Sequence, residues 1–178
     1  MANSKNVSPD IRAKELLEKC GFHKIPIPVE RIAKSLGAQV RYSPLDEELS
    51  GMVFIKDGIP IIGVNSLHHP NRQRFTIAHE IAHMLLHKDF ITSSVHVDKQ
   101  FSEPGLKRDA ESAKGADRLE IEANQFGAAL LMPKDILEDM LSEMSLDIED
   151  ENSLEALAKK FKVSKATLQY RIRNLLTE

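Results

Sequence analysis

The chain has 178 residues, of which 42% are hydrophobic and 29% charged, and its formal net charge is -3. This length supports one domain with a sizeable core, or a compact domain with a small helical appendage, and the charge gives no general attraction to nucleic acid or acidic membranes. The single cysteine, Cys20, excludes an internal disulfide. Because the chain shows neither the ~20 apolar residues of a membrane span nor a signal peptide in residues 1–10, we expect a cytoplasmic protein that contacts no membrane.

Two short helices are expected near the N-terminus. Ser8-Pro9-Asp10 is a strong helix start and Gly21 a stop signal, which together predict a helix over residues 9–20. A second helix is predicted over residues 29–36, closed by Gly37. Their apolar stripes are typical of helices packed on a core, and the alternative is that they form part of a DNA-binding unit.

A small, largely antiparallel sheet is expected next. Residues 50–56 and 59–64 are apolar and rich in β-branched side chains, and they flank Asp57-Gly58, a strong hairpin signal. Residues 38–42 alternate weakly and predict a further strand. Together with the helices, these strands predict an α+β fold. We expect the sheet of about three strands to lie beside the helix predicted from the next segment, residues 72–86.

The segment 72–86 contains the sequence His79-Glu80-Ile81-Ala82-His83. On a helix, residues four apart share a face, so the two imidazoles can hold one metal ion. Glu80 is adjacent and can accept a proton from the attacking water without being a ligand itself, as in the H-E-x-x-H pattern of zinc proteases. The alternative is a pair of core histidines with ordinary hydrogen bonds, but a mostly buried helix seldom carries two histidines and a glutamate without such a role.

Three other histidines lie close to this motif. His68 and His69 precede the helix, and we expect them to be surface or capping groups. His87 has ligand spacing from His83, but its bearing lies roughly 80° from that of His79 at 100° per residue. This offset favours a packing role or a role in supporting a ligand.

The segment that follows the motif is less regular. Residues 90–97 predict another short strand, and residues 99–116, which are charged and contain Pro104 and Gly105, predict a loop. The loop is interpreted either as a lid over the site or as a simple surface excursion.

A zinc ion held by two histidines needs at least one more protein ligand. The best candidates lie in the next predicted helix, residues 117–133. Glu120 and Asn124 are four apart and share a face, whereas Glu122 points away from it. We therefore expect Glu120 to be the third ligand and Asn124 to hold the other ring nitrogen of a histidine, with Glu122 a solvated charge.

These two motifs, together with the hairpin, resemble the ImmA/IrrE family of bacterial and phage zinc metallopeptidases over residues 27–133. The resemblance implies a zincin-like core and one zinc ion per chain, held by His79, His83 and Glu120, with Glu80 as the catalytic base. The E-x-x-x-N spacing of Glu120 and Asn124 is similar to the E-x-x-x-D of thermolysin-like enzymes. Family members of known role cleave transcriptional repressors, typically helix-turn-helix proteins encoded nearby.

The C-terminal part predicts a separate helical segment. A helix over residues 134–144 leads into the acidic residues 147–151, and residues 153–176 then predict two short helices around Lys162-Val163-Ser164. We therefore divide the chain into a metallopeptidase-like domain, 1–146, and a helix-turn-helix-like segment, 147–178. Lys165, Gln169, Arg171 and Arg173 would give the second helix a basic face, so DNA contact stays an alternative to substrate docking or plain packing.

The sequence thus predicts a zinc-dependent endopeptidase that acts on a repressor protein. One rival is a zinc-dependent regulator that binds a repressor without cutting it, and another is a DNA-binding module with a structural metal. The presence of Glu80 counts against both, because a structural site needs no base and usually completes its four ligands with Cys or His.

Overall fold

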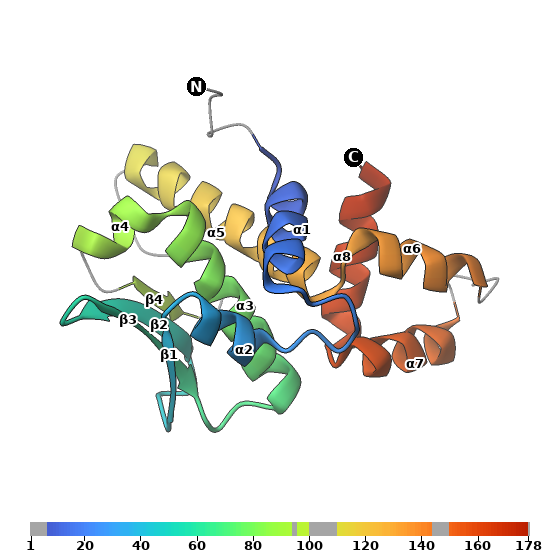
Figure 1. Cartoon of the computed structure of the whole chain (residues 1–178), viewed down its shortest axis with the longest axis horizontal. Coiled ribbons are helices and arrows are strands. Elements are labelled where there is room, and N and C mark those ends of the chain that lie inside the picture. Colours follow the sequence, from blue (N-terminus) through green and yellow to red (C-terminus); the bar gives the residue numbers. More distant parts are fainter. Residues whose placement is uncertain (1–6, 94–95, 100–109, 144–149, 178) are drawn as a thin grey trace.

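The computed structural model describes residues 7–93, 96–99, 110–143 and 150–177, which form an α+β fold as predicted (Figure 1). In chain order its elements are α1 (Pro9–Cys20), α2 (Val29–Ser35), β1 (Gln39–Ser43), β2 (Leu49–Lys56), β3 (Ile59–Asn65), α3 (Pro70–Leu86), α4 (Lys88–Ser93), β4 (His96–Lys99), α5 (Ala110–Leu131), α6 (Lys134–Glu143), α7 (Glu151–Phe161) and α8 (Lys165–Thr177).

Within the described residues, four strands form one sheet with the order β1-β3-β2-β4. β2 pairs antiparallel with both β3 and β4, and the predicted Asp57-Gly58 turn joins β2 to β3 with positive φ angles of 53° and 77°. β1 differs from an all-antiparallel sheet because it pairs parallel with β3. β1 and β2 therefore lie on opposite sides of β3 and run in opposite directions.

Local predictions of helix ends are confirmed at α1. The hydroxyl of Ser8 accepts a hydrogen bond from the backbone N–H of Ile11 at 3.4 Å, and Gly21 closes the helix with a φ of 71°. The strand predicted over residues 90–97 was wrong in its bounds. Residues 90–93 belong to α4, and the strand in this region, β4, covers His96–Lys99.

The loop predicted over residues 99–116 is also wrong in part. Residues 110–116 are the first turns of α5, which begins at Ala110, and residues 100–109, with the lid interpretation, lie outside the described residues. Helical backbone satisfies its own hydrogen bonds, so the charged sequence of these turns does not prevent a helix from forming.

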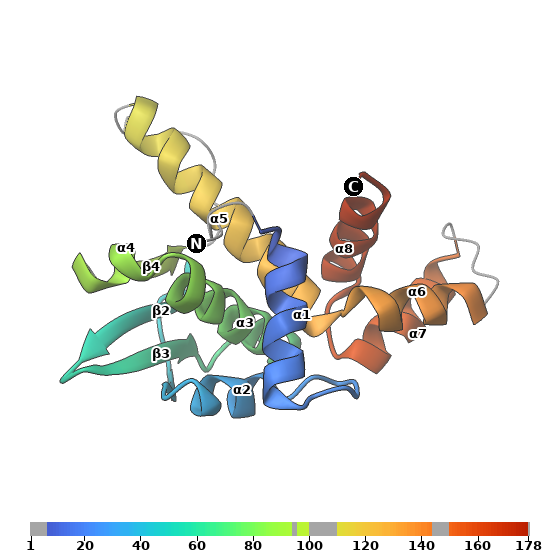
Figure 2. The ribbon, with the colours of Figure 1, turned by 45° about the horizontal axis from the view of Figure 1, so that its top comes forward.

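Helix α3 lies at the centre of the fold, between the sheet and α5 (Figures 1 and 2). Its middle part, from Thr76 to His83, is buried. α1 packs on the far side of α5, so the site helix is covered by a strand layer on one face and by helices on the other. This position predicts a rigid backbone for any group that α3 carries.

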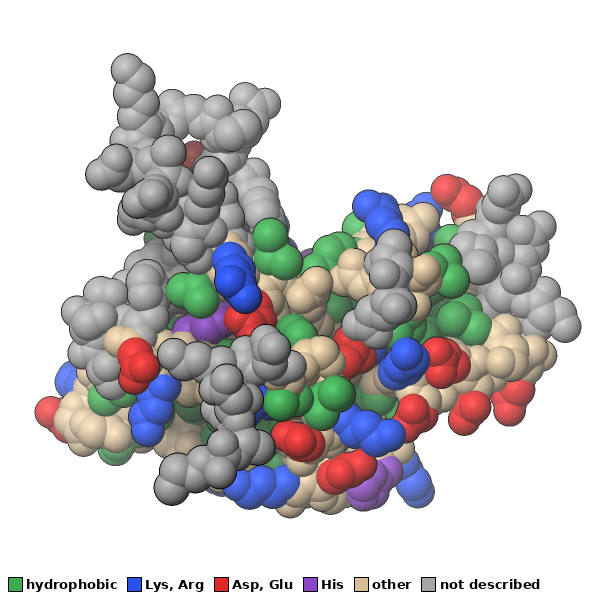
Figure 3. Space-filling view, turned by 90° about the horizontal axis from the view of Figure 1, so that it is seen from above, with side chains coloured by type: hydrophobic (Ala, Val, Ile, Leu, Met, Phe, Trp, Pro, Cys, Tyr) green, Lys and Arg blue, Asp and Glu red, His purple; other side chains and the backbone are tan. Residues whose placement is uncertain are grey.

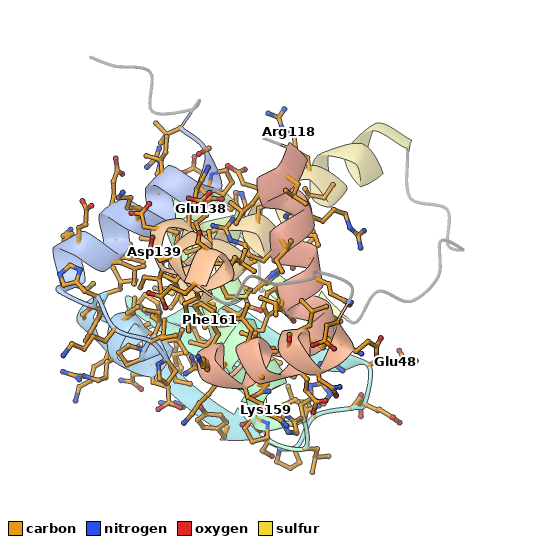
Figure 4. All side chains as sticks on the ribbon, turned by 90° about the vertical axis from the view of Figure 1, so that its right-hand side faces the viewer. Glu48, Arg118, Glu138, Asp139, Lys159 and Phe161 are labelled. Carbon is orange, nitrogen blue, oxygen red and sulfur yellow. The ribbon has the colours of Figure 1, made fainter. Side chains whose placement is uncertain are left out.

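The C-terminal helices α7 and α8 pack on the same body. Ser164 caps α8, as predicted, by accepting a hydrogen bond from the N–H of Thr167 at 3.0 Å. Phe161 points into the core, whereas Lys159 points outward (Figure 4). The buried side chains of both helices join one hydrophobic cluster with those of α1, α3 and α5. The described residues of α7 and α8 therefore share one core with the rest of the fold. The division into two domains at residue 146 stays a prediction.

The basic face predicted for α8 is not formed as expected. Arg171 is 1% exposed and is ion-paired with Asp10 of α1, and Lys165 bonds to Glu151 at 3.1 Å. The helical periodicity of the sequence predicts a polar, exposed position for Arg171. The structure differs because Asp10, near the other end of the sequence, pairs with this side chain in the interior. On the face shown in Figure 3, the described basic and acidic side chains are interspersed rather than gathered by sign.

Candidate metal centre

Helix α3 is anchored at its beginning by side chains that contact several other elements. The ring Nδ1 of His69 accepts a hydrogen bond from the N–H of Asn71 at 3.1 Å, so His69 is the helix cap, one of the two roles predicted for it. Arg72 donates to the hydroxyl of Ser50 in β2 at 2.8 Å. Arg74 donates to the carbonyl of Ile27 at 2.9 Å. These bonds fix the helix before it reaches its buried histidines.

Three predicted ligands converge at the middle of α3. The Nε2 atoms of His79 and His83 lie 3.0 Å apart, and Glu120 of α5 places its carboxylate oxygens 3.2 Å from the first and 3.5 Å from the second. Both histidines are buried, with 2% and 0% of their surfaces exposed. These three residues form a group with the donor types and spacing to hold one metal ion.

The spacing can be compared with what zinc requires. Zinc bound tetrahedrally by nitrogen and oxygen at about 2.0–2.1 Å has its ligand atoms about 3.3 Å apart. The three separations of 3.0, 3.2 and 3.5 Å bracket this value. Two imidazoles and one carboxylate are also a common donor set for a catalytic zinc ion, so the residues fit this metal.

The carboxylate of Glu120 is held in its charged form. Burial alone raises the pKa of this group, but hydrogen bonds and charge attraction from His79 and His83 outweigh burial and bring the pKa well below its ordinary value. An ionised carboxylate is the form that binds a cation.

Asn124, which lies on α5 like Glu120, contacts His79. Its Oδ1 atom lies 3.0 Å from Nδ1 of His79. An amide oxygen can only accept, so Nδ1 of His79 donates this hydrogen bond, and Nε2 carries a lone pair when the ring is neutral, as it must be to bind a metal. This is the geometry expected of Asn124.

Glu80 lies on α3 between the two histidines in sequence and is completely buried. Strand β2 passes close to it at Gly51, where an added Cβ atom would lie 3.6 Å from Oε1 of Glu80 and 2.7 Å from the carbonyl oxygen of Gly63. A side chain at position 51 therefore does not fit, and the glycine allows the strand backbone to form the wall beside the carboxylate.

Helix α5 also approaches α3 closely at a glycine. A Cβ atom at Gly127 would lie 3.3 Å from the backbone nitrogen of His79, which is tighter than an ordinary contact. The absence of a side chain at this position lets the helix bearing Glu120 pack against the backbone that carries the histidines.

Two residues near the site behave differently from the simplest expectation. Glu122, expected to be a solvated charge, bonds through Oε2 to Nε2 of His87 at 3.1 Å. His87 in turn lies with its Nδ1 atom 3.0 Å from Nδ1 of His83. Sequence reasoning admitted a supporting role for His87 but missed its partner, although the four-residue spacing from His83 was a signal for the contact. His68 remains outside the site and contacts Asn65 instead.

None of the helices in the described part of the chain combines the length and apolar character needed to cross a bilayer.

An α+β core in which two histidines of one helix and a glutamate of a second converge on one point defines a metallopeptidase-like protein.

The chain belongs to the family of IrrE N-terminal-like domains, peptidase family M78, whose model matches residues 33–173. This confirms the resemblance inferred from the motifs. The match also extends past residue 133 through α7 and into α8, so the C-terminal helices are part of the matched region.

Two curated relatives are metalloproteases by name. Over 112 residues the chain is 33% identical to the radiation response metalloprotease IrrE of Deinococcus radiodurans, which covers 62% of this chain and 30% of that protein. Over 87 residues it is 39% identical to the protein of the same name from Deinococcus deserti, covering 46% of this chain and 26% of that protein. The chain therefore spans less than a third of the length of these relatives.

A solved structure shares the fold. A Mycobacterium tuberculosis transcriptional regulator superposes with a TM-score of 0.64 at 18% identity, over 92% of this chain and 46% of that one. At this level of identity the likeness shows a common architecture.

Proposed function

We propose that the protein is a zinc-dependent endopeptidase. The observation that carries the proposal is the convergence of His79, His83 and Glu120 on one point. The buried carboxylate of Glu80 directly follows His79 on the same helix. Family membership and the two metalloprotease relatives support the same activity.

The residues divide the chemistry between them. When bound, zinc supplies Lewis-acid activation of water and of the scissile carbonyl. Glu80 accepts the proton of the attacking water and passes it to the leaving amine. Asn124 holds the ring of His79 in the tautomer that leaves Nε2 available. The close contacts at Gly51 and Gly127 keep the two helices and the strand in register around these groups.

The proposed substrate is a protein, specifically a transcriptional repressor of the helix-turn-helix type encoded nearby. This part of the proposal rests on the family resemblance, in which members of known role cleave such repressors. The proposed location is the cytoplasm, where a repressor would be encountered. Specific DNA binding by the chain itself is not part of the proposal, because Arg171 is buried and Lys165 is paired.

A comparison of wild type with Glu80→Gln tests the activity. Each would be co-expressed with the candidate repressor from a neighbouring gene, and the products would be analysed by mass spectrometry. Because Glu80 is the proposed base but not a ligand, the variant should keep zinc and bind the repressor, while cleavage falls by roughly 10²–10⁴-fold or more. Glu155→Gln in α7 is a matched control that removes one exposed carboxylate far from the site and should cleave like wild type.

The outcomes separate the proposal from its rivals. Repressor fragments with wild type and an intact complex with Glu80→Gln support the endopeptidase. Tight binding with an intact repressor in both cases favours a regulator that does not cut. Equal cleavage by both proteins means that Glu80 is not the base.

A further inference from the structure

A chain of three side chains leads from the metal centre to the edge of the protein. Nδ1 of His83 lies 3.0 Å from Nδ1 of His87, and Nε2 of His87 lies 3.1 Å from Oε2 of Glu122. The side chains of His83 and His87 are 0% and 3% exposed, whereas that of Glu122 is 37% exposed. The two imidazoles are therefore enclosed, and the carboxylate reaches solvent.

The proton positions of His83, His87 and Glu122 follow from which of their atoms can donate and which can accept a hydrogen bond. For His83 to bind a cation through Nε2, its proton must be on Nδ1, so this atom donates. Nδ1 of His87 must then accept and carry a lone pair, which puts the proton of His87 on Nε2. That N–H donates to the carboxylate of Glu122, which can only accept in its ionised form. The tautomer of His83 thus determines that of His87, and in each of the two contacts one atom donates and the other accepts.

The two histidine ligands are consequently supported by different groups. His79 donates to the neutral amide oxygen of Asn124, whereas His83 donates to an imidazole that is itself bonded to a carboxylate. A charged acceptor at the end of the chain polarises both imidazoles and makes Nε2 of His83 the more basic donor to a cation. The support for His83 comes from both helices, because His87 follows α3 directly and Glu122 lies on α5.

We propose that His87 and Glu122 are positioning residues for the metal centre: together they fix the tautomer and ring orientation of His83 and so strengthen its bond to zinc. This inference rests on the proposed zinc site but adds two residues to it. Neither residue belongs to the proposed ligand set. Residues that support a metal-bound histidine in this way typically change metal affinity by roughly 10- to 100-fold when removed.

A double-mutant cycle on the full chain tests this coupling. The variants are His87→Phe, which keeps a ring but has no nitrogen, Glu122→Ala, and the two combined. Zinc affinity is measured by competition with a chelator. Each single variant should weaken zinc binding by roughly 10- to 100-fold, and the double variant should be little weaker than His87→Phe alone, because Glu122 acts only through His87.

Further measurements distinguish positioning from simple stabilisation. Glu122→Gln keeps one oxygen that can accept from His87, so it should retain more affinity than Glu122→Ala. The thermal midpoint should be measured with and without zinc, and the variants should lose mainly the zinc-induced increase. The visible spectrum of the cobalt-substituted protein should also change in the His87 and Glu122 variants but not in Glu155→Gln.

The tautomer of His87 provides a test on the unmodified protein. Nitrogen NMR of the zinc-loaded wild type should show the proton of His87 on Nε2 and the lone pair on Nδ1. This result keeps the test decisive even where His87→Phe does not fold. A proton on Nδ1 of His87 overturns the proposal.

The remaining outcomes separate this inference from the proposed function. A wild-type chain that takes up no zinc contradicts both. Zinc binding with additive losses in the cycle overturns the positioning role and leaves the metal site standing. A coupled cycle in a protein that cleaves no repressor supports the positioning role and contradicts the endopeptidase.

Discussion

The guanidinium group of Arg171 in α8 is ion-paired with the carboxylate of Asp10 in α1, across 161 positions of sequence. Nη1 donates to Oδ2 of Asp10 at 2.7 Å, and Nε donates to the carbonyl oxygen of Met132 at 3.2 Å. The side chain of Arg171 is 1% exposed and that of Asp10 is 17% exposed. Helix α8 is therefore fixed to α1 and to the residue that follows α5 by one buried cation.

Arg171→Leu should lower the free energy of unfolding by about 3–5 kcal/mol, because it leaves the carboxylate of Asp10 without its cation. Urea denaturation at neutral pH measures the loss. Lys165→Ala is the control, since its ion pair with Glu151 is exposed and should change stability by less than about 1 kcal/mol. Equal effects from the two variants would show that the Arg171 pair contributes no more than a surface contact.

Glu120→Gln should reduce zinc retention much more than Glu122→Gln. The first variant replaces a charged ligand by a neutral amide, whereas the second keeps all three ligands and one acceptor for His87. Wild type should retain about one zinc ion per chain after dialysis against a weak chelator, as determined by elemental analysis. Equal retention in the two variants, or loss only in the Glu122 variant, is the result that rejects Glu120 as the ligand.

Gly51→Ala should destabilise the fold by about 1–3 kcal/mol through overpacking. The new Cβ atom would contact the methyl group of Thr76 and lie 2.7 Å from the backbone oxygen of Gly63, and backbone cannot move aside cheaply. Gly63→Ala is the matched control in the next strand, where the Cβ atom meets the flexible side chain of Met52 at 3.0 Å. Denaturant unfolding should show the larger loss at position 51, and the reverse order would contradict the close approach of β2 to α3.

The whole chain should give no sequence-specific shift with DNA in a gel assay at physiological salt. Arg171 is enclosed, Lys165 is paired, and the formal net charge is -3, so too few cations of α8 are available to neutralise phosphates. A salt-sensitive shift on a defined site that disappears in a Lys165→Ala, Arg173→Ala variant would establish DNA binding by α8.

The parts of the site that depend on local spacing were predictable from sequence. The four-residue separations of His79 from His83 and of Glu120 from Asn124 fix which side chains share a helix face, and the structure has both pairs on the side where α3 meets α5. The caps at Ser8 and Ser164 and the Asp57-Gly58 turn are likewise set by a few neighbouring residues.

The parts that depend on distant contacts were not predictable. The sequence analysis compared the helical bearing of His87 with that of His79, and this comparison tests only whether His87 is a ligand. In the structure His87 contacts His83, and its second partner is Glu122 of α5. The parallel pairing of β1 with β3 depends on topology rather than on the alternation of either strand. The burial of Arg171 depends on an aspartate near the other end of the chain, which no periodicity reveals.

The turn between α7 and α8 has a consequence for how the protein is made. Asn71 donates to the carbonyl of Val163 at 3.0 Å and Arg74 donates to that of Lys162 at 3.3 Å, so the beginning of the histidine-bearing helix finds these acceptors 92 and 88 positions later in the sequence. During synthesis on the ribosome, both histidines and Glu120 emerge well before these acceptors. Because non-local contacts of this kind form late, the nascent chain should reach its protease-resistant state only after the turn has left the exit tunnel, and it should acquire the metal only after that point.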